Sequence, residues 1–119
     1  MGVIFDAEEG NIKVLRIAGM LEKPEFDSVT RAEAKQWGPQ TRVRLLVLAD
    51  GFEGWERSEG WGDLSFYMEY GDRIERIAIV ADPKWETDLL MFAASGLRRA
   101  PVRFFPSTQI ESARAWLRQ

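Results

Sequence analysis

Two short apolar runs constrain the fold of this chain more than any other feature of its sequence. The first covers residues 45–49 and reads Leu-Leu-Val-Leu-Ala, and the second covers residues 74–81 with Ile-Ala-Ile-Val at its centre. The first run is apolar throughout and the second from residue 77 onward, as is expected for strands that are buried on both faces of a sheet. Such strands need helices on either side of the sheet, so the chain is predicted to be an α/β protein.

Helices are predicted between and after these runs. Pro24 suits the first position of a helix, where its missing N–H costs nothing. Asp82 is a capping residue directly before a proline, and Thr108 and Glu111 have the spacing of a capping box. The four predicted helices cover residues 24–37, 58–68, 83–93 and 108–117.

The remaining strands complete the predicted architecture. Residues 3–5 and 12–17 form a hairpin, because Gly10-Asn11 between them can adopt the positive φ angles of a tight turn. Residues 101–105 form the last strand. The order is therefore ββαβαβαβα, in which strands that alternate with helices are parallel neighbours. We predict one domain over residues 1–119, with a mixed five-stranded sheet flanked by four helices.

The residue types present argue against catalysis. The chain has no cysteine, which excludes a thiol nucleophile and Cys-based metal sites, and no histidine, the usual general base and commonest metal ligand. It has no nucleophile elbow, phosphate loop or dinucleotide fingerprint. Its acidic residues near position 55 lack the alternating pattern of a calcium loop. We therefore predict no enzyme, no cofactor and no bound metal.

The net charge and the hydropathy of the chain limit the kinds of partner that it is expected to bind. The formal net charge is −3 and the isoelectric point is near 5.1, which argues against nucleic acid because phosphates require a basic face. No apolar run reaches the length needed to cross a bilayer, and the first residues do not resemble a secretory signal. We therefore expect a cytoplasmic protein without a membrane span.

Residues 50–58 are predicted to form a loop, and the segment from residue 50 to residue 61 is the most unusual in the chain. It places large aromatic residues among acidic ones, directly after a central strand, and open α/β sheets often bind ligands at that edge. The aromatic side chains either form a binding surface or fold back to complete the core, and the sequence leaves both readings open. The candidate binding residues are Asp50, Phe52, Trp55, Ser58, Glu59 and Trp61.

Several segments in this order resemble a known family. They are residues 45–49, Gly51-Phe52-Glu53-Gly54-Trp55, residues 61–64, residues 76–82 followed by Lys84-Trp85, residues 102–105, and Ala113, Trp116 and Leu117. Together they resemble the SpoIIAA-like family, small bacterial proteins related in fold to the STAS domains of anti-sigma-factor antagonists. The resemblance implies a STAS-type sheet with flanking helices.

The same resemblance implies a binding or regulatory function without catalysis. STAS proteins bind a partner kinase and are controlled by phosphorylation of a serine at the start of the second helix. Ser58 matches that position, but it lacks the preceding aspartate of the STAS pattern and is followed by Glu59. The fold is also similar to CRAL-TRIO lipid-binding domains. We expect a module that engages an unknown protein partner through this loop, or alternatively a carrier of a small apolar or lipid-like ligand. The oligomeric state, including a homodimer, stays open.

Overall fold

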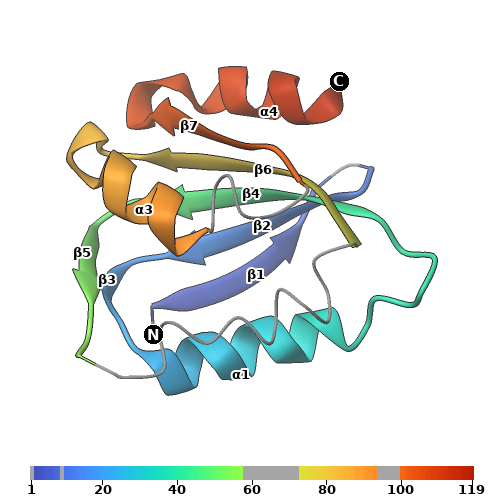
Figure 1. Cartoon of the computed structure of the whole chain (residues 1–119), viewed down its shortest axis with the longest axis horizontal. Coiled ribbons are helices and arrows are strands. Elements are labelled where there is room, and N and C mark those ends of the chain that lie inside the picture. The colour runs from blue at the N-terminus through green and yellow to red at the C-terminus, as the bar shows by residue number, and fades with distance from the viewer. Residues whose placement is uncertain (1, 9, 58–72, 94–99) are drawn as a thin grey trace.

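The computed structural model describes residues 2–8, 10–57, 73–93 and 100–119. Its centre is a five-stranded sheet with the order β1-β2-β4-β6-β7, shown in Figure 1. The strands are β1 (Val3–Ala7), β2 (Ile12–Ile17), β4 (Val43–Ala49), β6 (Ile74–Ala81) and β7 (Val102–Pro106). β1 is antiparallel to β2, and every other neighbouring pair is parallel. The prediction of a mixed five-stranded sheet is confirmed.

Helices cover the sheet from both sides. They are α1 (Lys23–Ala34), α3 (Glu86–Phe92) and α4 (Ile110–Arg118), and the 3-10 helices Pro83–Trp85 and Ser107–Gln109 precede α3 and α4. α1 and α3 pack on one face, whereas α4 packs on the other, as Figure 1 shows. The helix predicted over residues 58–68 lies outside the described residues. No described helix is long and apolar enough to cross a membrane.

The side chains of β4 explain why this strand is apolar throughout. Leu45 and Val47 belong to the core under α1 and α3, while Leu46 and Leu48 belong to the core under α4. Successive side chains of a strand point to opposite faces, so both cores need apolar residues from the same segment. The prediction that this run is a strand buried on both faces is therefore confirmed.

A second, two-stranded sheet was not predicted. It consists of β3 (Gly19–Leu21) and β5 (Phe52–Trp55), which run parallel to each other. The prediction that residues 50–58 are entirely loop is wrong for residues 52–55. These strands are short, and each is stabilised by a partner distant in sequence, so neither shows the alternation by which a strand is usually recognised.

Two predicted helix boundaries are also corrected. α1 ends at Ala34 instead of residue 37, and Trp37 lies beyond it with its ring buried in the core. The Trp37 indole donates to Glu33 Oε2 at 3.1 Å, which fixes the ring without a further helical turn. Thr108 does not cap α4, because it lies within the 3-10 helix Ser107–Gln109. No side chain caps the start of that 3-10 helix or the start of α4. The cap at Asp82 is confirmed: its Oδ1 accepts from the Lys84 N–H at 2.9 Å.

Candidate functional site

The site begins with a sharp turn at the carboxyl end of β4. Gly51 has φ 71°, a conformation that favours glycine, and the chain then enters β5. Backbone hydrogen bonds hold β5 at both ends: Gly19 N–H donates to Gly51 O, and Glu56 N–H donates to Leu21 O, each at 2.9 Å. The segment with the candidate binding residues is thus a strand with a fixed position beside the main sheet.

Five aromatic rings from different parts of the chain contact one another around β5. Phe52 and Trp55 lie on β5, Trp85 precedes α3, Phe92 lies on α3 and Phe26 lies on α1. The ring centroids are 4.9 Å apart for Phe52–Trp55 and Phe52–Trp85, 5.4 Å for Trp55–Phe92 and 5.2 Å for Phe26–Phe92. Most of these pairs are edge-to-face, the favoured arrangement of aromatic rings. We call these five residues the aromatic cluster.

Gly54 lets one of the rings approach the backbone of β5. It has φ 111°, and a Cβ atom added there would lie 3.4 Å from the Trp85 ring. The backbone angle therefore favours a glycine at this position, and an added Cβ atom would be in van der Waals contact with the Trp85 ring. The Lys84 Nζ atom lies over the Trp85 ring, 5.8 Å from the ring centroid.

Trp55 has a buried hydrogen-bond donor that is left without an acceptor in the aromatic cluster. Its side chain is partly buried, but its indole Nε1 is shut off from solvent and has no hydrogen-bond acceptor. It is the one such buried side-chain polar atom found in the described part of the chain. A buried donor without a partner destabilises a protein by about 1–3 kcal/mol. Such a group in a folded protein calls for an explanation, and an acceptor that enters the cluster is one.

The acidic residues around β5 have different environments. Asp50 and Glu53 are exposed. Glu56 instead accepts from the Lys23 N–H through Oε1 at 3.0 Å, at the first residue of α1. The residue at the N-cap position, Glu22, makes no side-chain cap of its own. Glu56 therefore acts as the cap of α1 from 33 residues away, a structural role that sequence spacing did not indicate.

The structure brings together only part of the predicted site. Asp50, Phe52 and Trp55 lie in or beside β5, and Phe52 is buried with 5% of its surface exposed. Ser58, Glu59 and Trp61 fall outside the described residues. Trp85 was not among the predicted binding residues, although the structure places it in the aromatic cluster. Because β4 and β6 are parallel neighbours, the segments that follow them must meet at one edge, and this signal predicts the contact.

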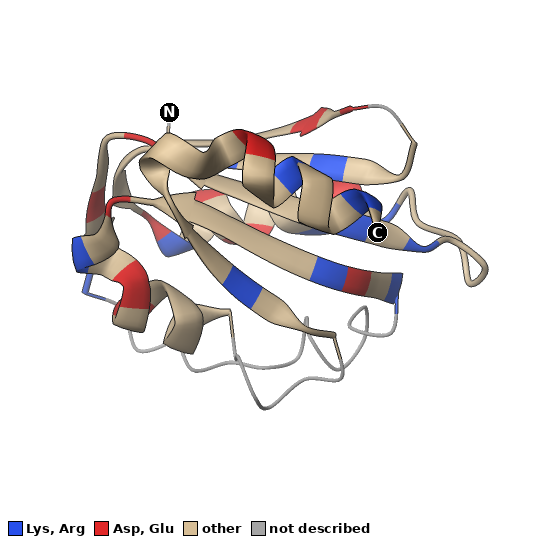
Figure 2. Cartoon of the chain, turned by 90° about the horizontal axis from the view of Figure 1, so that it is seen from above, with Lys and Arg blue, Asp and Glu red and all other residues tan. Residues whose placement is uncertain are grey.

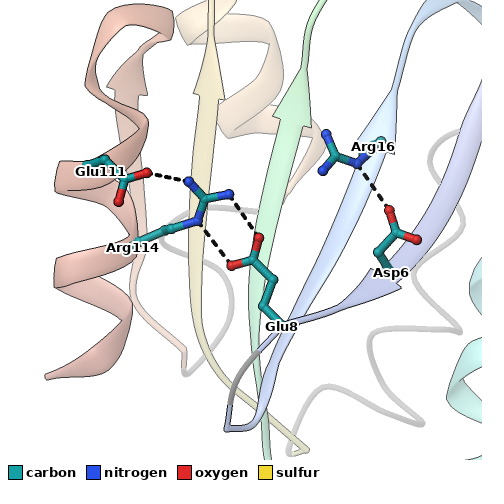
Figure 3. A network of polar contacts seen from close by, with 5 residues as sticks. All are labelled: Asp6, Glu8, Arg16, Glu111 and Arg114. Carbon is teal, nitrogen blue, oxygen red and sulfur yellow. Dashed lines mark hydrogen bonds and ion pairs between the residues drawn. The ribbon is translucent and has the colours of Figure 1, made fainter.

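The opposite face of the sheet carries a network of charged residues, drawn in Figure 3. Arg114 of α4 donates to both carboxylate oxygens of Glu8, at 3.0 and 2.9 Å, and also pairs with Glu111. Arg16 Nε donates to Asp6 Oδ2 at 3.1 Å. The hydrogen bonds from Arg114 lower the pKa of Glu8 below its ordinary value. Among the described residues, no group of His, Cys, Asp or Glu is arranged to hold a metal ion.

Comparisons with known proteins agree with this architecture. A family model described as SpoIIAA-like matches residues 12–118. Among solved structures, the chain is similar to an uncharacterized protein of the DUF3478 family with a SpoIIAA-like fold from Shewanella loihica PV-4. That match has a TM-score of 0.76 and 19% identity, and it covers 98% of this chain and 94% of that chain. At this identity the likeness shows the fold alone. No curated protein matches the chain.

Proposed function

The chain belongs to the SpoIIAA-like family, and from this premise we propose that it is a non-catalytic binding module for a small molecule. The ligand has an apolar body and one hydrogen-bond acceptor, and it binds at the aromatic cluster. The observation that carries this proposal is the buried indole N–H of Trp55, which has no acceptor.

The surroundings of Trp55 support an apolar ligand over a polar one. Phe52, Trp85 and Phe92 all lie within ring-contact distance of Trp55. Aromatic walls with one well-placed polar group are typical of small-molecule sites. A carboxylate is the favoured acceptor, because hydrogen bonds to charged groups are stronger than those between neutral groups. Since Nε1 is shut off from solvent, the acceptor must enter the cluster and cannot pair from outside.

The proposal is tested with decanoate as the probe, added to ¹⁵N-labelled protein from which bound lipid has been extracted. We expect the indole N–H resonance of Trp55 to move downfield on binding. Trp55→Phe keeps a ring but removes the donor, and we expect it to weaken binding about tenfold or more, because a hydrogen bond to a charged group contributes about 1.5–3 kcal/mol. Trp116→Phe, on α4 across the sheet, is the matched control and should bind like the parent. Equal binding by Trp55→Phe would contradict the proposal.

A protein partner is the second candidate function, and the exposed side of the small sheet favours it. Met20 of β3 is 51% exposed. Glu53 lies on β5, the strand paired with β3, and Asp50 lies just before β5; both are exposed. One apolar residue with acidic neighbours fits a partner with a basic, partly apolar surface. Here we expect Met20→Lys to abolish the interaction with a partner identified by cross-linking, while Trp55→Phe leaves it intact. The reverse result would assign the function to the aromatic cluster.

A further inference from the structure

The two edges of the five-stranded sheet differ in how they resist pairing with another strand. β7, at one edge, follows Pro101, ends at Pro106 and carries the exposed Arg103. Prolines and charged side chains are common protections of an edge strand. β1, at the other edge, has no proline or lysine and pairs with β2 without a register shift. β1 is therefore the less protected edge.

The backbone of β1 has an unpaired side. Ala18 N–H donates to Gly2 O, and Glu8 N–H donates to Ile12 O, each at 2.9 Å. In an antiparallel ladder, alternate residues point their N–H and C=O groups toward the partner. The backbone groups of Gly2 and Glu8 thus point toward β2. The backbone groups of the residues in odd positions (Val3, Phe5 and Ala7) therefore point away from β2, toward the open edge of the sheet. No hydrogen bond to these outward groups occurs within the described residues. In Figure 2, β1 starts at the N label and runs along the rim of the molecule.

One face of β1 is also uncovered. α4 packs mainly on β4, β6 and β7 on that side of the sheet, and the Arg114–Glu8 ion pair joins it to the end of β1. Ile4 lies on this face and is 50% exposed. The only charged residue of β1, Asp6, is already paired with Arg16 of β2. Its carboxylate therefore repels an approaching strand less than an unpaired carboxylate would.

We propose that β1 pairs with β1 of a second copy of this chain, in an antiparallel arrangement about a two-fold axis at Ile4. The outward groups of Val3 then bond to those of Phe5 in the other copy. The two Ile4 side chains meet as a non-hydrogen-bonded pair, where opposing side chains lie closest. Asp6 of each copy lies opposite Gly2 of the other, so the two carboxylates stay apart. Two five-stranded sheets thereby become one continuous sheet.

Self-complementarity selects a second copy over an unrelated strand. The pairing satisfies the same donors and acceptors on both sides, as a closed two-fold interface requires. It also covers the exposed Ile4 with an identical apolar residue and leaves both Asp6–Arg16 pairs intact. An unrelated strand would need to supply both features from another sequence.

The absence of cysteine from the chain allows a direct test. In this register the two Ile4 Cα atoms lie about 4.5 Å apart, a separation that a disulfide can bridge. We expect Ile4→Cys to form a disulfide-linked dimer readily in a glutathione redox buffer. Met91→Cys is the control for exposure, because Met91 is 74% exposed on α3. Asp6→Cys is the control for register, because four residues of offset separate its two copies by about 13 Å. Neither control should cross-link at a comparable rate.

Sedimentation of the unmodified chain provides the second arm of the test. We expect a concentration-dependent dimer that Ile4→Lys converts to monomer and Met91→Lys leaves unchanged. Both sites are exposed, so these substitutions are not expected to unfold the chain. A chain that stays monomeric at every concentration, or Ile4→Cys that cross-links no faster than Met91→Cys, would overturn the proposal. A dimer that Ile4→Lys leaves intact would also overturn it, because the interface would then lie elsewhere. A failure of decanoate binding bears on the aromatic cluster alone.

Discussion

Gly54 shows how one residue shapes the candidate site. Its φ of 111° is outside the range that residues with a side chain usually adopt, and the Trp85 ring occupies the space next to its Cα atom. Gly51, three residues earlier, has φ 71° but nothing within 4 Å of an added Cβ atom. The two glycines therefore differ in their backbone angle and in whether an added side chain would touch a ring.

We expect Gly54→Ala to lower the free energy of unfolding by about 1–3 kcal/mol, because a φ of 111° strains a residue that has a side chain. Gly51→Ala is the control in the left-handed region, with φ 71°, and we expect a smaller loss of about 1 kcal/mol. Urea unfolding curves followed by tryptophan fluorescence measure both values. Equal losses for the two variants would contradict the greater backbone strain expected at Gly54.

At the scale of whole elements, continuous apolar runs were predicted well and contacts between distant segments were not. β6 has the predicted bounds, and β4 extends the predicted run by two residues, because strands buried on both faces have a nearly continuous apolar signal. β5 was missed because it has only four residues, of which two are glutamate and glycine, so it contains no apolar run. Asp50, Phe52 and Trp55 were recognised as unusual, but the aromatic cluster depends on Phe26 and Phe92, which helical spacing alone assigns to a core.

The start of α1 depends on Glu56, the residue directly after β5. We expect Glu56→Ala to destabilise the protein by about 0.5–2 kcal/mol, the range measured for lost helix caps. Glu56→Gln keeps an oxygen acceptor and should lose less. Hydrogen exchange locates the effect: amide protons at the first turn of α1 should exchange faster in Glu56→Ala, while those of α4 should not change. Uniform acceleration throughout the chain would show that Glu56 stabilises the whole domain and does not act as a local cap.

For the molecule as a whole, the ion pair between Glu8 and Arg114 joins segments 106 residues apart. It holds the β1–β2 hairpin to α4 across the outer side of the sheet, as Figure 3 shows. Two arginines fix the other end of the same helix: Arg44 donates to Leu117 O, and Arg76 donates to Trp116 O at 2.8 Å. α4 is thus attached to β4, to β6 and to the turn after β1 by charged hydrogen bonds as well as by its apolar side.

The Glu8–Arg114 pair predicts a pH dependence of stability. Hydrogen bonds from Arg114 lower the pKa of Glu8 in the folded chain below its ordinary value of 4.5. The stabilisation is therefore complete above the ordinary value and is lost as the pH falls through the lowered pKa. In Arg114→Met, we expect the Glu8 pKa, measured by carboxyl ¹³C NMR, to rise toward its ordinary value. The unfolding free energy should also depend less on pH below 4.5. An unchanged Glu8 pKa in Arg114→Met would assign the shift to another group.

The position of α4 in the chain has a consequence during synthesis on the ribosome. Among the described residues, α4 is the one helix that covers its face of the sheet, and it follows all five strands in the sequence. Leu46, Leu48 and Val80 belong to that face, so they remain in contact with water after their strands have left the exit tunnel. A nascent sheet with one apolar face open is prone to aggregation. We therefore expect the growing chain to need chaperone protection until α4 emerges.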